Sequence, residues 1–310
     1  MTVSIAILGY GKIAADQHVP AIAATNGFHL AAIVSRRGVG PAGIPVFTSI
    51  KDLLDSGIHI DAISLCNSPA ERFDAAVEAI NAGLHVFLEK PPAVSLEQAE
   101  TLVRLANAKG VTLFASWHAR ANTAVERAKE ILADREVLRA QIRWCEDVNK
   151  WHPGQDWIWR AGGFGVFDPG INALSILAHI LPFALMCDQA RLDVPVGSET
   201  PLRVEMSLRA DDGGFVAKAV FDWSPIVEEC WEIIIETSDG TVMLDQGGMR
   251  LWVDGACLLT APDEEYRRLY LQFGGVIKTA TSDVDLSPLR LVAQAEAIGT
   301  THRVDFVPVR

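Results

Sequence analysis

Short apolar runs alternate with amphipathic stretches over the first part of the chain. The apolar runs are Val3–Leu8, Leu30–Val34, Ala62–Leu65, His85–Leu88 and Thr112–Ala115. The stretches with helical periodicity are Ile13–Ala24, Ala70–Asn81 and Leu96–Ala108. Continuous apolar strands separated by helices are typical of a parallel sheet that is covered on both faces. The pattern therefore predicts an α/β, doubly wound domain over residues 1–119.

After a predicted linking helix the pattern changes to strands separated by turn residues. The strand-like runs are Arg139–Trp144, Arg203–Leu208, Val216–Trp223 and Trp231–Thr237. Residues 211–214 (Asp-Asp-Gly-Gly) and 238–240 (Ser-Asp-Gly) have the composition of hairpin turns. Hairpins make neighbouring strands antiparallel, so residues 120–310 are predicted to form an α+β domain with an open, mainly antiparallel sheet.

The composition is that of a folded protein with an acidic surface. The chain has 310 residues, 49% of them hydrophobic and 21% charged, and a net charge of −12. An acidic surface disfavours nucleic acid and anionic membrane as partners. The apolar stretch Ile171–Cys187 is too short to span a bilayer and predicts a buried helix.

The cysteines and the N-terminal residues bear on the cellular compartment. The five cysteines are scattered without CxxC spacing, which predicts reduced thiols and no metal site. The first residues lack a basic region and lead into a strand, so no signal peptide is expected. Together these features predict a cytoplasmic protein.

A glycine motif, Gly9-x-Gly11-x-x-Ala14, directly follows the first predicted strand and opens a helix. In that position the backbone can approach a pyrophosphate, and the helix N-terminus favours its charge. The motif therefore predicts a dinucleotide cofactor. The alternative is a tight turn with small residues that serve packing alone.

The second predicted strand ends at Ser35-Arg36-Arg37, where NAD enzymes usually carry a carboxylate for the ribose 2′-hydroxyl. Arg36 can instead hold a 2′-phosphate in a bidentate fork, and Ser35 can donate a further hydrogen bond. This favours NADP, with NAD also possible as a cofactor. The alternative is a solvated arginine pair in a loop.

Glu89-Lys90-Pro91 follows a buried strand at the edge of the sheet where ligands bind. Lys90 can there hydrogen-bond a substrate hydroxyl and take up its proton. The alternative is a Lys-Pro entry into a helix. His118 ends the last strand of the domain, which places it on the same edge.

Polar and aromatic residues also gather in the second half. Asp168 and Asn172 are four residues apart at the start of an apolar helix and can share one face, although Asp168 can also serve as the N-cap. Four of the eight tryptophans fall at 144, 151, 157 and 159, beside Glu146 and His152. Such a mixture suits a sugar, whose C–H face stacks on a ring and whose hydroxyls take polar partners. The alternative is a hydrophobic hinge.

With these residues assembled, the chain resembles the Gfo/Idh/MocA family of nicotinamide-dependent sugar oxidoreductases. The resemblance covers essentially the full length and includes the glycine loop, Glu89-Lys90-Pro91, Gly162-Gly163 and Asp168. Within the family the chain is similar to bacterial aldose 1-dehydrogenases that act on L-arabinose or D-galactose, through Trp151–Gln155, Trp157–Trp159 and Val166–Ser175.

The resemblance implies oxidation of C1 of an aldopyranose to a lactone, with hydride passing to the nicotinamide. Many family members carry histidine where this chain has Asn172, and an amide is no acid or base at neutral pH. The proton role therefore falls on Lys90 and Asp168. The expected substrate contacts are His118, Glu146, Trp151, His152, Asn172 and Trp231. The expected cofactor contacts are Gly9, Gly11, Lys12, Ile13, Ser35, Arg36, Cys66, Asn67, Glu89, Lys90 and Trp159.

Other functions fit the same residues. A dehydrogenase of an inositol or of another sugar derivative, an oxidoreductase that retains its cofactor, and a non-catalytic sugar or NADP sensor all remain open. A homo-oligomer formed through the second domain's open sheet is also expected.

Overall fold

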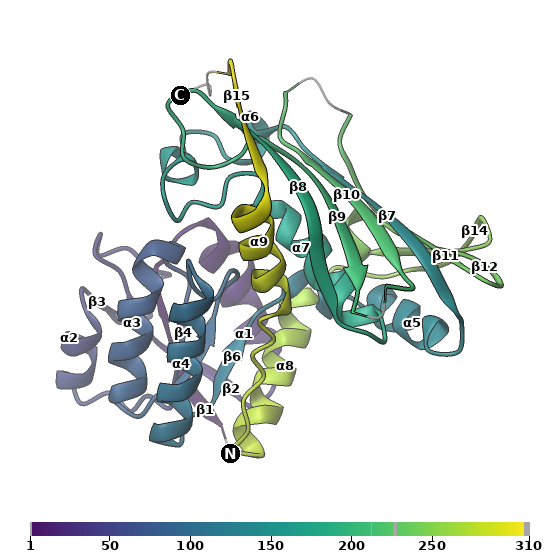
Figure 1. The fold of residues 1–310 in the computed structure, drawn as a ribbon. Coiled ribbons are helices and arrows are strands. Elements are labelled where there is room, and N and C mark those ends of the chain that lie inside the picture. Colours follow the sequence, from purple (N-terminus) through teal and green to yellow (C-terminus); the bar gives the residue numbers. More distant parts are fainter. Residues whose placement is uncertain (1, 212, 226–227, 307–310) are drawn as a thin grey trace. The chain divides into compact units, whose positions relative to one another are not determined.

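A computed structural model describes residues 2–211, 213–225 and 228–306. The chain divides into two compact units (Figure 1). The first unit consists of Met1–His118 and Glu264–Asp285, and the second of Ala119–Asp263 and Leu286–Arg310.

The first unit is built on a parallel six-stranded sheet in the order β3-β2-β1-β4-β5-β6. Its strands are β1 (Val3–Leu8), β2 (Phe28–Val34), β3 (Val46–Phe47), β4 (Ala62–Leu65), β5 (His85–Leu88) and β6 (Leu113–Ala115). The strand order reverses between β1 and β4, which is the switch point at which open α/β sheets bind ligands beyond the carboxyl ends of their strands. The predicted doubly wound parallel sheet is confirmed.

The helices of the first unit lie between these strands in sequence, except α8, which follows β14. They are η1 (Ala14–His18), α1 (Val19–Ala24), α2 (Ile50–Asp55), α3 (Pro69–Asn81), α4 (Leu96–Lys109) and α8 (Glu265–Lys278). The helix predicted over Ile13–Ala24 contains a π-helical turn, η1, ahead of α1. β3 and α2 were not predicted because two and six residues are too few to show a periodicity.

The segment Glu264–Asp285 returns from the second half of the sequence to the first unit. The division at residue 119 assigned it to the second domain. It belongs to the first unit because its aromatic side chains complete that core: the ring of Tyr270 lies 5.0 Å from that of Phe87, and the ring of Phe273 lies 5.5 Å from it. Local periodicity shows that α8 is amphipathic but not which core it covers.

The second unit contains a nine-stranded sheet in the order β14-β13-β12-β11-β7-β10-β9-β8-β15. Its strands are β7 (Val137–Cys145), β8 (Leu185–Pro195), β9 (Arg203–Ala210), β10 (Val216–Asp222), β11 (Cys230–Thr237), β12 (Gly240–Asp245), β13 (Arg250–Val253), β14 (Ala256–Thr260) and β15 (Thr300–Val304). The predicted turns join the antiparallel pairs β9–β10 and β11–β12; Asp212 in the first turn lies outside the described residues. Two pairs, β7–β10 and β8–β15, are parallel.

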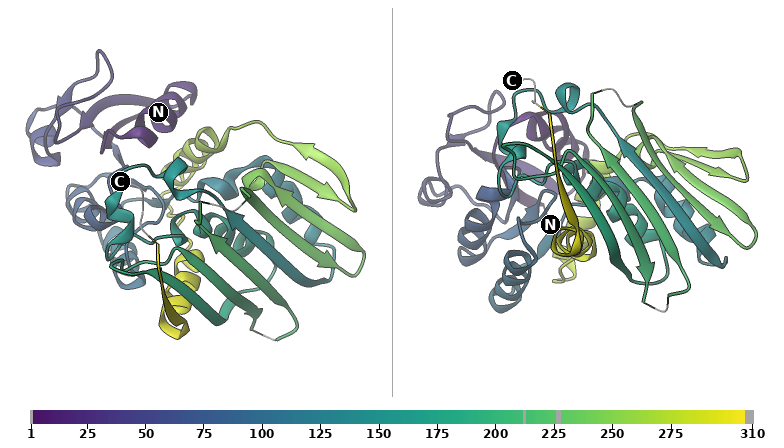
Figure 2. Two further views of the ribbon diagram at one scale, coloured as in Figure 1. Left: turned by 90° about the horizontal axis from the view of Figure 1, so that it is seen from above. Right: turned by 45° about the horizontal axis from the view of Figure 1, so that its top comes forward.

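Helices of the second unit pack on this sheet. They are η2 (His118–Ala121), α5 (Thr123–Leu132), α6 (Val148–Trp151), η3 (Asp156–Trp159), α7 (Phe167–Ile180), η4 (Gln246–Gly248) and α9 (Ser287–Ile298). Helix α7 contacts β7 and β11, α5 contacts β12 and β13, and the helices α5 and α7 lie on one face of the sheet (Figure 2). The stretch Ile171–Cys187 is helical only to Ile180, because Pro182 interrupts it and β8 begins at Leu185. Within the described ranges, no helix combines the length and apolar character needed to cross a membrane.

Candidate functional site

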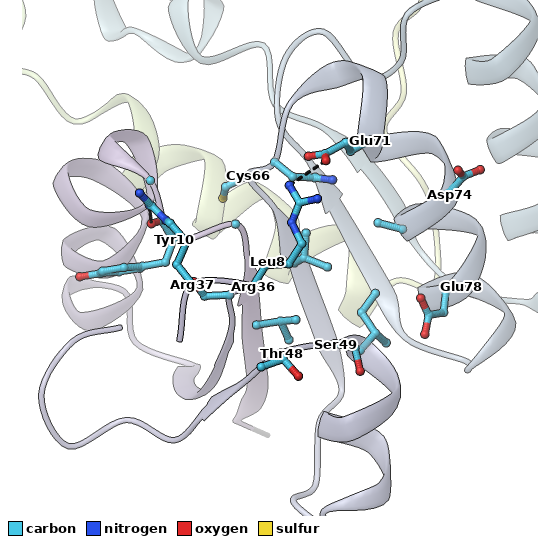
Figure 3. Close-up of a pocket in the computed structure, with 17 residues that line it drawn as sticks. Leu8, Tyr10, Arg36, Arg37, Thr48, Ser49, Cys66, Glu71, Asp74 and Glu78 are labelled. Atoms are coloured by element: carbon cyan, nitrogen blue, oxygen red, sulfur yellow. Dashed lines mark hydrogen bonds and ion pairs between the residues drawn. The ribbon is translucent and has the colours of Figure 1, made fainter. Parts of the chain in front are cut away.

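A pocket of about 490 Å³ opens at the carboxyl ends of β1, β2 and β4 in the first unit (Figure 3). It therefore lies at the switch point of the strand order. The predicted cofactor residues among its lining are Gly9, Gly11, Ser35, Arg36, Cys66 and Asn67. The lining also includes Tyr10, Arg37, Thr48, Ser49, Glu71, Asp74 and Glu78.

The glycine loop approaches its neighbouring strand very closely. Gly9 has φ +91°, and a Cβ atom there would lie 2.7 Å from the backbone nitrogen of Asn67. A side chain at this position would force β1 and β4 apart at the pocket floor. A Cβ on Gly11, in contrast, would meet no heavy atom within 4 Å, which leaves room for a ligand beside the backbone at the helix N-terminus.

The polar groups of this pocket fit a dinucleotide. The side-chain oxygen of Asn67 is buried, and within the described residues it has no hydrogen-bond partner, so a donor on a ligand can satisfy it. Burial raises the pKa of the Cys66 thiol, the nearby Glu89 charge raises it further, and the thiol is therefore neutral. An open glycine backbone, an unsatisfied acceptor and Arg36 together match the polar parts of a pyrophosphate-linked nucleotide.

Both arginines at the end of β2 already have partners. The Arg36 guanidinium pairs with Glu71 on α3 across 2.7 Å, as Figure 3 shows. Arg37 donates to the backbone oxygen of Tyr10 at 3.0 Å. Ser35 is buried beside them. Both arginines are exposed, and 79% of the Arg36 side chain is accessible.

Five predicted cofactor contacts are not part of the pocket lining: Lys12, Ile13, Glu89, Lys90 and Trp159. The ammonium of Lys12 is exposed and pairs with Asp16 one helical turn later. Ile13 is also exposed. Trp159 belongs to the second unit, where its ring is buried 5.7 Å from that of Trp223.

Glu89 is a buried carboxylate that holds four parts of the first unit together. Its Oε1 atom accepts hydrogen bonds from His18 Nε2 and from the Tyr266 hydroxyl, each at 2.8 Å, and its Oε2 atom accepts from the Lys90 backbone N–H at 2.9 Å. Arg72 donates to the Glu89 carbonyl at 2.8 Å. Glu89 therefore fixes the backbone at Lys90 from within the protein, and both of its carboxylate oxygens are occupied by protein groups.

The charge of Glu89 is set by these partners. Burial raises its pKa, but the hydrogen bond from His18 and the charges of His18, His118 and Arg72 outweigh burial and bring the pKa to about 2. Glu89 is therefore ionised at neutral pH. The peptide bond between Lys90 and Pro91 is cis.

A hydrogen-bond chain extends from Glu89 into the core. His18 Nδ1 lies 2.7 Å from the Tyr270 hydroxyl, which in turn lies 2.9 Å from Ser64 Oγ on β4. The chain links η1, α8 and the sheet. His18, Tyr266 and Tyr270 were not predicted as site residues, because their hydrogen-bond partners are 71 to 252 positions away.

His118 lies near Lys90, at the predicted edge of the sheet. Its Nδ1 atom is 2.7 Å from Glu265 Oε2, and its ring stacks on that of Tyr266 at 5.7 Å. Burial lowers the pKa of His118, and the Lys90 charge lowers it too, but the charge and hydrogen bond of Glu265 prevail and raise it. The imidazole is thus held in a fixed orientation by α8.

In the second unit, Glu146 lies at the end of β7 between two tryptophans. The indole N–H of Trp223 donates to Oε1 and that of Trp231 donates to Oε2, both at 3.0 Å. Burial raises the pKa of Glu146 above its usual value, despite these hydrogen bonds and the nearby His152. Trp223 was not predicted. The feature that could have indicated a site role for Trp223 is its position directly after β10. This strand runs parallel to β7 and pairs Asp222 with Cys145, the residue before Glu146.

His152 brings Glu146 and Asp168 into one cluster. Its Nε2 atom lies 3.9 Å from Glu146 Oε1 and 4.0 Å from Asp168 Oδ2. Its ring centroid lies 4.9 Å from that of Trp223. One imidazole nitrogen thus faces two carboxylates beside an aromatic ring. The predicted site residues Glu146, His152 and Asp168 therefore lie together, and Trp223 adds an indole ring to them.

Asp168 and Asn172 lie one turn apart on α7, as expected. The N-cap residue of α7 is Val166, so Asp168 lies in the first turn and does not act as the N-cap. The Asn172 side-chain oxygen is buried without a hydrogen-bond partner among the described residues. Gly163, in the loop before α7, packs so closely that a Cβ would lie 2.3 Å from the Trp157 carbonyl oxygen.

Trp151 and Trp231 form an edge-to-face pair with centroids 5.9 Å apart. The Trp151 indole donates to Glu229 at 2.8 Å, and almost half of its side chain is exposed. These rings therefore offer an accessible aromatic face next to Glu146. In the parts of the chain that the structure describes, no group of three or more His, Cys, Asp or Glu residues is arranged to hold a metal ion.

Comparison with known proteins gives relatives of the same length. Residues 3–116 match the family model described as "Oxidoreductase family, NAD-binding Rossmann fold" (GFO_IDH_MocA). The chain is 40% identical to galactose 1-dehydrogenase of Pseudomonas fluorescens over 98% of both chains. It is 45% identical to a crystal structure of D-galactose-1-dehydrogenase from Rhizobium etli, with a TM-score of 0.93 and coverage of 98% of this chain and 97% of that one.

The fold extends to more distant proteins. KijD10, a 3-ketoreductase from Actinomadura kijaniata solved in complex with NADP and TDP-benzene, has a TM-score of 0.85 at 17% identity, and the match covers 98% of this chain and 100% of that one. At this identity the similarity shows the common architecture alone.

The buried Glu89 carboxylate predicts a pH-dependent stability. Its pKa of about 2, against an ordinary 4.5, means that ionised Glu89 stabilises the fold above pH 4.5 and that this contribution is lost as the pH falls toward 2. We expect Glu89→Gln to lower the free energy of unfolding at pH 7 by about 3 kcal/mol. Urea titrations at several pH values measure the free energy of unfolding, and the difference in this free energy between the variant and the wild type should shrink below pH 4.5.

Glu100→Gln is the matched control, since Glu100 is an exposed glutamate on α4. It should change stability by less than about 0.5 kcal/mol at any pH. A Glu89→Gln deficit that stayed constant down to pH 2.5 would show that loss of the charge is not its cause.

Proposed function

Because the chain belongs to the Gfo/Idh/MocA family of NAD-binding oxidoreductases, we propose that it oxidises the C1 hydroxyl of an aldopyranose, such as D-galactose or L-arabinose, to the lactone. Membership makes it an NAD(P)-dependent oxidoreductase that acts on a CH–OH group. The observation that supports a sugar as the substrate is a cluster of polar side chains beside two indole rings. It consists of Glu146, His152 and Asp168 next to Trp223 and Trp231. The names of the full-length relatives support the reaction at C1.

The pocket of the first unit supplies the cofactor contacts. The loop at Gly9 and Gly11 would hold the pyrophosphate, and Asn67 would donate or accept beside it. When bound, the nicotinamide supplies the acceptor for the hydride that leaves C1. Lys12, Ile13 and Trp159 remain proposed contacts, and Glu89 acts by fixing the backbone of Lys90.

Lys90 and Asp168 are the proposed proton-handling residues. Removing a hydride from C1 requires that the anomeric hydroxyl lose its proton to a base. An amine or a carboxylate can accept it, whereas Asn172 can only orient the sugar. Asp168 Oδ2 lies 4.0 Å from His152 Nε2, so a proton received there would reach His152 only after the two side chains move closer or through a bridging water.

The remaining side chains would bind the sugar ring and its other hydroxyls. Glu146 keeps its carboxyl oriented by two indole N–H groups, and His118 is oriented by Glu265. The accessible faces of Trp151 and Trp231 suit the C–H face of a pyranose.

We expect NADP to be preferred over NAD, since Arg36 stands where NAD enzymes carry a carboxylate. Self-association is also proposed, through the face of the nine-stranded sheet opposite α5 and α7. Light scattering of the purified chain gives its mass in solution, and a monomer at micromolar concentration would contradict this proposal.

A panel of aldoses and polyols, monitored for nicotinamide reduction with both cofactors, tests the function directly. We expect D-galactose or L-arabinose to give the highest kcat/KM and inositol to give little. Lys90→Met should lower kcat at least about 100-fold when sugar and cofactor are both saturating. Retention of most of the turnover by Lys90→Met would refute its catalytic role.

Arg36→Ala tests the cofactor preference. We expect the ratio of NADP to NAD affinity to fall about tenfold or more, because a charge-assisted contact to the 2′-phosphate is lost. NAD affinity serves as the internal control. An unchanged ratio would remove Arg36 from the phosphate site.

A further inference from the structure

The cofactor pocket carries a carboxylate beside the arginine expected to bind the 2′-phosphate. Glu71 lies in the first turn of α3, and its Oε1 atom is 2.7 Å from the Arg36 guanidinium. Asp74 and Glu78 on the same helix also line the pocket (Figure 3). The pocket-lining side of α3 thus carries negative charge next to Arg36, and this charge would oppose a phosphate bound by that arginine.

We propose that Glu71 is a specificity-determining residue for the cofactor, because its carboxylate competes with the NADP 2′-phosphate for Arg36 and can accept a hydrogen bond from the NAD 2′-hydroxyl. This inference rests on the proposed phosphate-binding role of Arg36. Glu71 then narrows the preference for NADP and makes NAD a usable second cofactor.

Glu71 and the 2′-phosphate of NADP would compete for the same group, the guanidinium of Arg36. A guanidinium binds one anion best, in a bidentate fork. NADP must therefore separate Arg36 from Glu71 or share Arg36 with it, and in either case the two anions repel each other. NAD meets no such competitor. In NAD enzymes a carboxylate at the end of the second strand accepts a hydrogen bond from the 2′-hydroxyl. In this chain the residue at that place is Arg36, and the carboxylate of Glu71 on α3 lies beside it.

Neighbouring groups do not replace Arg36. Arg37 is directed to the Tyr10 carbonyl, and Ser35 is buried. Arg36 and Glu71 are 79% and 44% exposed, so both side chains are able to rearrange around a ligand. Their pairing is a weak exposed interaction, which sets the expected effect at a few-fold change.

Cofactor binding without sugar provides the test. Dissociation constants for NADP and NAD are measured by calorimetric titration for wild type, Glu71→Gln, Arg36→Ala and the double variant. We expect Glu71→Gln to raise the ratio of NADP to NAD affinity about two- to fivefold, through tighter NADP binding and weaker NAD binding. In the Arg36→Ala background the gain in NADP affinity should disappear.

Asp74→Asn is the matched control, because it removes the same charge from the same helix, and no ion pair is found between Asp74 and Arg36 among the described residues. It should change the ratio less than twofold. An equal effect of Asp74→Asn, or a full effect of Glu71→Gln without Arg36, would attribute the change to the general field of α3 and overturn the competition.

The outcome also separates this inference from the function on which it rests. If Arg36→Ala leaves the ratio of NADP to NAD affinity unchanged, the 2′-phosphate is bound elsewhere, and the proposed roles of Arg36 and Glu71 are both wrong. If Arg36→Ala lowers the ratio while Glu71→Gln leaves it unaltered, the phosphate site stands and the role of Glu71 is wrong. Thermal unfolding of each variant confirms that the exposed substitutions leave the fold intact.

Discussion

The buried carboxylate of Glu89 is the constraint around which the first unit is organised. A charge removed from water must be matched by fixed donors, and here the donors come from η1, from α8 and from the backbone of Lys90. Each partner is therefore held in register with the end of β5. The side chain expected to handle the substrate proton begins from the backbone atom that Glu89 fixes, so the interior of the protein determines where chemistry at the sheet edge can occur.

The second unit solves a similar problem with aromatic donors. Glu146 is buried and is oriented by indole N–H groups, which carry no charge. Its pKa therefore moves up, whereas that of Glu89 moves down. Two buried glutamates thus have opposite electrostatic environments: the partners of Glu89 outweigh the effect of burial on its pKa, whereas burial outweighs the hydrogen bonds to Glu146.

The family, the parallel sheet and the oxidoreductase class were predictable from the sequence, because they depend on local patterns. The strand periodicity is read within short windows, and the parallel sheet, the family and the oxidoreductase class are confirmed. The assignment of residues 264–285 to the second domain was wrong, since Tyr270 and Phe273 join a core formed by residues such as Phe87, far away in sequence. The ion pair between Arg36 and Glu71 likewise depends on where the first turn of α3 lies relative to the end of β2, and no local sequence pattern predicts that position. The roles of individual site residues remain predictions.

The return of α8 has a consequence for biosynthesis. As the chain leaves the ribosome, β1 to β6 emerge before α8, so Phe87 and Phe114 lack their contacts with Phe273 until that residue has followed. The intervening 119–263 segment, which forms most of the second unit, must emerge before the earlier unit is complete. The core of the first unit is thus completed only after most of the second unit has been made, and a gene fragment that stops at residue 119 encodes a sheet whose core lacks the rings of Tyr270 and Phe273.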